Sequence, residues 1–161
     1  MKMLQQSILK TDGYHVTFDW IFLPEYSLMD AVITFSTVPG LQLITAKSDV
    51  TYIRYKDMER LIKYFQDFVA EAMKDSTAST YVFVPSELGF NLQPSGGEIV
   101  SSDDGCFSLT FMVNIGRDPG GTYTYVGGES LVDLVELQIF LDSLQEVIDQ
   151  YQKGKGQDSD S

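Results

Sequence analysis

The chain has 161 residues, of which 43% are apolar and 12% aromatic, and its formal net charge is −12. A chain of this length buries roughly two-thirds of its unfolded surface, so we expect one compact domain over residues 1–152. The acidic balance opposes contact with phosphate groups, so we expect neither nucleic acid nor a membrane as partner. The sequence has no signal-peptide core and no window of about 18 apolar residues, and we expect a cytoplasmic protein.

Period-two alternation predicts strands in the first third of the chain. Tyr14, Val16, Phe18 and Trp20 alternate with polar residues, as expected of a strand that buries one face. Further strands are predicted at residues 31–35, 41–45 and 50–55.

Two long amphipathic helices are predicted, one over residues 57–74 and one over residues 130–151. In the first, apolar residues recur every three or four positions and charged residues occupy the other side. Ser130 and Asp133 have the spacing of a capping box at the start of the second. The second helix also carries apolar residues outside its main stripe, so we expect it to be covered on more than one side or to contact a partner.

Short β-rich segments separated by glycine turns lie between the two helices. Strands are predicted at residues 81–84, 88–92, 98–100, 107–113 and 122–126. Strand runs joined by short turns favour antiparallel pairing, so the expected fold is α+β. We expect a mostly antiparallel sheet of about seven to nine strands, with both helices packed on it. The polar, glycine-bearing residues 153–161 are expected to be a disordered tail.

The sequence contains little that indicates catalysis or metal binding. His15 is the only histidine and Cys106 the only cysteine, so no internal disulfide and no zinc site of cysteines and histidines is expected. The acidic turns at residues 103–105 and 116–121 lack the spacing of a calcium loop. We expect no catalytic residue, no metal and no cofactor. A hydrolase that uses Cys106 as nucleophile and His15 as base is kept as a third hypothesis.

The negative charge is concentrated in the second half of the chain. Residues 1–74 carry 8 basic and 9 acidic groups, whereas residues 75–152 carry 1 basic and 12 acidic groups. Such a surface can serve solubility alone, or it can attract a basic partner by long-range electrostatic steering. Both interpretations remain open from the sequence.

Candidate partner-binding residues lie on the predicted second helix and on the turn before the strand at 107–113. One set is expected on one side of the helix, and the other set opposite its main apolar stripe. The first set is Glu129, Asp133 and Glu136; the second is Asp142, Glu146 and Asp149; the turn adds Asp103 and Asp104. Val132, Val135 and Ile139 lie away from the main stripe and form a possible apolar contact, which a loop of the same chain or a partner covers.

The arrangement resembles that of the small acidic immunity proteins encoded beside bacterial polymorphic toxins. The resemblance rests on the meander with residues 111–116, on residues 125–129 leading into the last helix, and on Phe140 and Leu141 within it. It implies a cytosolic, non-enzymatic protein that binds a basic toxin or nuclease domain and blocks its active face. The alternative from a different class is a homo-oligomeric structural or adaptor domain, for example a homodimer that uses Val132, Val135 and Ile139.

Overall fold

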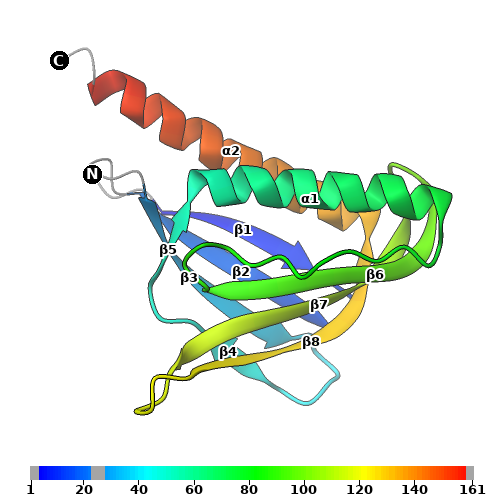
Figure 1. Ribbon diagram of the computed structural model, residues 1–161, viewed down its shortest axis with the longest axis horizontal. Coiled ribbons are helices and arrows are strands. Elements are labelled where there is room, and N and C mark those ends of the chain that lie inside the picture. The colour runs from blue at the N-terminus through cyan, green and yellow to red at the C-terminus, as the bar shows by residue number, and fades with distance from the viewer. Residues whose placement is uncertain (1–3, 23–27, 159–161) are drawn as a thin grey trace.

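The computed structural model describes residues 4–22 and 28–158 (Figure 1). Among these residues, five strands precede the first helix, and three strands separate it from the second. The strands are β1 (Leu4–Lys10), β2 (Tyr14–Ile21), β3 (Leu28–Thr37), β4 (Thr45–Lys47), β5 (Thr51–Arg54), β6 (Phe90–Ser101), β7 (Asp104–Arg117) and β8 (Tyr123–Asp133). The helices are α1 (Tyr55–Lys74) and α2 (Leu134–Asp158). The α+β class and the antiparallel pairing are confirmed.

The strands form two sheets, so the prediction of a single sheet is wrong. One sheet has the order β1-β2-β3-β4, with β5 also paired to β3, and the other has the order β6-β7-β8. Both bury one face: Phe18 on β2 and Phe111 on β7 are almost fully buried. Alternation in sequence shows that a strand has a buried face, but it does not show whether two strands pair edge to edge or face each other across a core.

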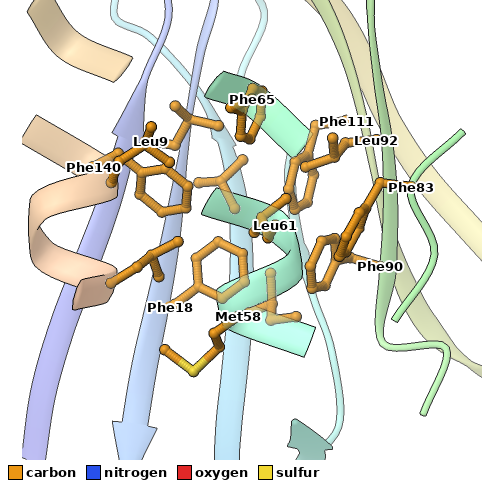
Figure 2. Close-up of a cluster of buried hydrophobic side chains, with 14 of the residues drawn as sticks. Leu9, Phe18, Met58, Leu61, Phe65, Phe83, Phe90, Leu92, Phe111 and Phe140 are labelled. Atoms are coloured by element: carbon orange, nitrogen blue, oxygen red, sulfur yellow. The ribbon is translucent and has the colours of Figure 1, made fainter. Parts of the chain in front are cut away.

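One hydrophobic core fills the space between the two sheets and the helices (Figures 1 and 2). Phe18 lies at its centre, with ring centroids 5.4 Å from Phe90, 6.1 Å from Phe111 and 5.7 Å from Phe140. These three rings come from β6, β7 and α2, so one side chain of β2 contacts the opposite sheet and a helix. Full burial of each such ring contributes about 1.5–3 kcal/mol.

Helix α1 confirms the helix predicted over residues 57–74, with two additional residues at its start. Met58, Leu61, Phe65 and Phe68 form its buried side, as their spacing predicted. Helix α1 packs on β6 and β5, and α2 packs on β1, β7 and β8; the helices also contact each other.

Helix α2 begins four residues later than predicted, because residues 130–133 continue strand β8. Val132 is fully buried opposite Phe107 of β7, whereas Leu131 is exposed, so the period-two pattern of a strand extends to Asp133. The capping box of Ser130 and Asp133 therefore does not form. The helix continues to Asp158, into the segment predicted to be a disordered tail, and residues 159–161 lie outside the described residues.

Three further assignments differ from the prediction. Of the strand predicted at residues 41–45, residues 41–44 lie in no strand, and β4 begins only at Thr45. Residues 81–84 contribute only an isolated bridge, between Phe83 and Leu92 of β6. Residues 93–97, the glycine turn expected between the strands predicted at 88–92 and 98–100, lie within β6, where a bulge interrupts pairing with β7. Gly97 lies in this bulge with φ of +115°, and a Cβ at this position would lie 2.4 Å from the Cys106 carbonyl oxygen. Glycine permits both the conformation and the close approach.

Candidate functional site

The solvent-exposed stripe of α2 carries the most prominent group of predicted partner-binding residues. Val135, Ile139, Asp142, Glu146 and Asp149 are all exposed and follow one another at spacings of three and four residues. Such residues lie on one side of a helix, and we name this side the α2 face. Its first half is apolar, since Val135 is 58% and Ile139 55% exposed, and its second half is acidic.

Two of the three carboxylates of the α2 face, those of Asp142 and Asp149, have amide partners, and none of the three has an ion-pair partner among the described residues. Gln138 Nε2 donates to Asp142 Oδ1 at 2.8 Å, and Gln145 Nε2 donates to Asp149 Oδ1 at 2.9 Å. The four ion pairs among the described residues all lie between Arg54 and Glu87. No ion pair among the described residues therefore offsets the negative charge of the α2 face.

A second acidic group lies where β6, β7 and β8 reach the start of α2. Cys106 of β7 pairs with Glu98 of β6 on one side and with Asp133 of β8 on the other. Directly opposed residues share a face of an antiparallel sheet, so these three side chains form a row. Asp103 lies in the adjoining β6–β7 turn, where Ser101 Oγ donates to its Oδ1 at 2.8 Å, and Asp104 is the first residue of β7. We name Glu98, Asp103, Asp104 and Asp133 the acidic sheet end.

A groove of about 170 Å³ lies along the contact between the two helices. Phe65, Val69 and Met73 line it from α1, and Leu134, Leu137 and Leu141 line it from α2. Ser102 of the β6–β7 turn closes one end, which places the acidic sheet end beside the first turns of α2. Met73 is 44% exposed, so apolar surface continues from the groove to solvent.

The structure separates two of the residue sets predicted to lie together. Glu129 and Asp133 lie on the outer face of β8, and only Glu136 belongs to α2, so these three do not form one side of a helix. Glu129 instead lies beside β7, where Ser108 Oγ donates to its Oε1 at 2.5 Å. Burial, with a smaller contribution from the Glu129 carboxylate, raises the pKa of Tyr14 far above its ordinary value. Of the three apolar candidates, Val132 is buried in the core and only Val135 and Ile139 are exposed.

Glu98 and Met73 are the surface residues that the prediction missed. The register across the β6–β7 hairpin is needed to place Glu98 beside Cys106, because a bulge shifts the pairing between Ser95 and Glu98. Met73 is at the end of the apolar pattern of α1, and its exposure depends on where α2 crosses.

Cys106 and His15 lie in different sheets, and the structure links them by no hydrogen bond. Cys106 lies in β7, whereas His15 lies in β2 between Lys10 and Ser36. The part of the chain that the structure describes contains no group of three acidic, histidine or cysteine side chains able to hold a metal ion. Among the same residues, no helix has the length and apolar character needed to span a membrane.

No protein-family model matches the chain, and no curated protein matches it significantly.

Proposed function

We propose that the protein is a non-enzymatic, cytosolic inhibitor of the immunity type, which binds a basic protein such as a toxin or nuclease domain through the α2 face and the acidic sheet end. The observation that carries the proposal is the distribution of ion pairs. All four occur between Arg54 and Glu87, while the acidic residues from Glu98 to Asp149 have none among the described residues.

Apolar surface beside the carboxylates supports a protein partner. Val135 and Ile139 extend the acidic stripe of α2, and the residues that precede them in the chain, Leu134 and Gln138, line the groove beside Met73. Interfaces combine apolar contacts that exclude water with charges that steer the encounter. A surface that served solubility alone has no need for apolar residues in line with its carboxylates.

The test compares two variants with the same change in charge on the two helices. The α2 variant carries Asp142→Asn, Glu146→Gln and Asp149→Asn, and the α1 control carries Glu59→Gln, Asp67→Asn and Glu71→Gln. The first candidate partner is the product of the adjacent gene, because the genes of the proteins resembled lie beside those of their toxins. We expect the wild-type protein and the α1 control to bind this product and suppress its toxicity on co-expression. The α2 variant is expected to lose both.

Two results would contradict the proposal. Equal suppression by the α2 variant and the α1 control would show that the α2 face is not the contact. Wild-type binding that does not weaken between low and high salt would show that the charges do not steer the encounter, since exposed charges are screened within about 10 Å at 0.1 M salt.

A homodimer through the apolar end of the α2 face is the second candidate, favoured by the exposure of Val135 and Ile139. Sedimentation at several protein concentrations tests it. A dimer that persists in high salt and is lost on Ile139→Gln supports this candidate, and a monomer at all concentrations removes it.

A further inference from the structure

A pocket of about 250 Å³ lies where the two sheets meet, and it shares no residue with the α2 face. Its walls come from four segments that are far apart in sequence: the β4–β5 link, the loop before β6, the end of β7 and the start of β8. Residues 48–52, Glu87, Gly89, Asn114, Gly116, Arg117 and Tyr123 line it. Its volume is below the roughly 300–1,000 Å³ of sites for whole small molecules, which suits a single side chain.

Hydrogen bonds fix the wall formed by the loop before β6. Asn114 is buried, and its Nδ2 donates to the Leu88 carbonyl oxygen at 3.0 Å. The hydroxyl of Tyr125 donates to the same oxygen at 3.0 Å. Leu88 has a φ of +57°, a conformation that a residue other than glycine adopts only where its surroundings impose it.

The wall formed by the β4–β5 link is equally well fixed. The backbone amide of Ser48 donates to the Ile33 carbonyl oxygen, and the amide of Ile33 donates to Ser48 Oγ, both at 2.9 Å. A Cβ on Gly89 would lie 2.8 Å from Thr51 Oγ1, so the two walls are in close contact at the base. The pocket is therefore largely preformed.

Asp49 is the charged group in this pocket that has no partner among the described residues. Glu87 pairs with Arg54 at 3.8 Å, and the guanidinium of Arg117 lies 4.4 Å from the centre of the Tyr123 ring. The Asp49 carboxylate reaches across to β7, since a Cβ on Gly116 would lie 3.7 Å from its Oδ2. The ring of Tyr52, at 50% exposure, supplies an uncovered aromatic surface at the same pocket.

We propose that this pocket binds the guanidinium group of an arginine side chain. A guanidinium is planar and positively charged, so it can pair with the Asp49 carboxylate through two parallel hydrogen bonds and stack on the ring of Tyr52. Arg117 already shows such stacking on Tyr123 at the rim of the pocket. The positive charge of Arg117 repels a bound cation. Removal of this charge therefore tests whether electrostatic repulsion lowers the affinity of the pocket for a guanidinium.

Nuclear magnetic resonance titration with N-acetyl-arginine amide tests this proposal, with the neutral isostere N-acetyl-citrulline amide as control. We expect saturable shifts of backbone amides in residues 48–52, 87–89 and 114–117 with the arginine probe only. Asp49→Asn is expected to weaken binding about tenfold, because it removes a charge-assisted pair. Arg117→Ala is expected to strengthen it, and Tyr52→Ala to weaken it in an otherwise unchanged spectrum.

Equal shifts with the citrulline probe, or unchanged affinity in Asp49→Asn, would overturn the proposal. Weaker binding of the arginine probe in Arg117→Ala would also overturn it, since removal of a positive charge at the pocket should favour a bound cation. The α2 variant, with Asp142→Asn, Glu146→Gln and Asp149→Asn, is expected to bind the probe as tightly as wild type. A result that contradicts arginine binding in the pocket is thus distinguishable from one that contradicts partner binding by the α2 face.

Discussion

The acidic residues of the two helices differ in whether they form ion pairs. Helix α1 has four acidic and four basic residues, and Asp57, Asp67 and Glu71 each have an ion-pair partner on the same helix. Between Leu134 and Gln152, α2 has four acidic residues and no basic one, and its hydrogen-bonded carboxylates have glutamine partners. Two neighbouring helices on one core therefore differ in whether their carboxylates form ion pairs within the described residues, and the proposal of a basic partner for α2 rests on this difference.

Truncation of Phe18 tests whether the two helices depend on one core, and it has the largest expected effect. Phe18 contacts Phe90, Phe111 and Phe140, which belong to β6, β7 and α2. Phe18→Ala is expected to lower the free energy of unfolding by about 3–5 kcal/mol. Urea denaturation followed by circular dichroism and by tryptophan fluorescence measures this loss. Two separate transitions would show that α1 and α2 belong to independent units.

Removal of one carboxylate from each helix compares how much each contributes to stability, and it has the second-largest expected effect. Asp57 is buried, and it accepts hydrogen bonds from the Ser86 amide at 3.0 Å and from Arg60 at 3.2 Å. Asp57→Ala is expected to cost about 1–3 kcal/mol, because the Ser86 amide and the Arg60 guanidinium lose the buried acceptor that joins α1 to the loop before β6. Asp142→Ala is expected to change the free energy of unfolding by less than about 0.5 kcal/mol, as for other exposed positions. Equal decreases in the free energy of unfolding for the two variants, measured by urea denaturation, would contradict this difference between the helices.

The free energy of unfolding is also expected to fall at high pH, because of Tyr64 on α1. Burial raises the pKa of Tyr64 on α1 to about 12, against an ordinary value of about 10. Because the folded protein holds this proton more tightly than the unfolded chain, its contribution is complete below about pH 10 and is lost as the pH rises to about 12. Tyr64→Phe is expected to flatten this decline in the free energy of unfolding. An unchanged decline in the variant would assign it to other groups, such as Tyr14, whose pKa is also raised by burial.

Neutralisation of the α2 face has the smallest expected effect on stability. Asp142, Glu146 and Asp149 repel one another and have no ion-pair partner among the described residues. Their replacement by Asn, Gln and Asn is therefore expected to leave the free energy of unfolding unchanged within about 0.5 kcal/mol, or to raise it. The melting temperature in low salt measures this. A decrease of more than about 2 kcal/mol in the free energy of unfolding would mean that these carboxylates stabilise the fold, which contradicts their proposed role in binding.

Local patterns predicted the elements well where one strong periodicity ran along the chain. The alternation from Tyr14 to Trp20 gave β2, and the three- and four-residue spacing from Met58 gave α1. Strand β1 escaped prediction because Gln5, Gln6 and Ser7 make it polar. Ser7 is nevertheless buried, and its Oγ accepts a hydrogen bond from Trp20 Nε1 at 2.9 Å, a partner that only the strand pairing brings within reach.

Features that depend on tertiary contact could not be predicted in this way. The division into two sheets follows from which apolar faces meet, and the row of Glu98, Cys106 and Asp133 follows from a bulge that sets the register. At the candidate site, the spacing predicted the exposure of Asp142, Glu146 and Asp149. It did not predict the start of α2, because residues 130–133 satisfy helix and strand patterns equally.

The association rate constant with the product of the adjacent gene, measured at several salt concentrations, tests the central claim most directly. We expect the rate for the wild-type protein and the α1 control to fall steeply with salt, and the rate for the α2 variant to be about tenfold lower at low salt and nearly independent of salt. The two variants carry the same change in charge, so only the position of that charge differs. Equal rates for the α2 variant and the α1 control would contradict the account, because the total charge of the protein would then determine association, and not the α2 face.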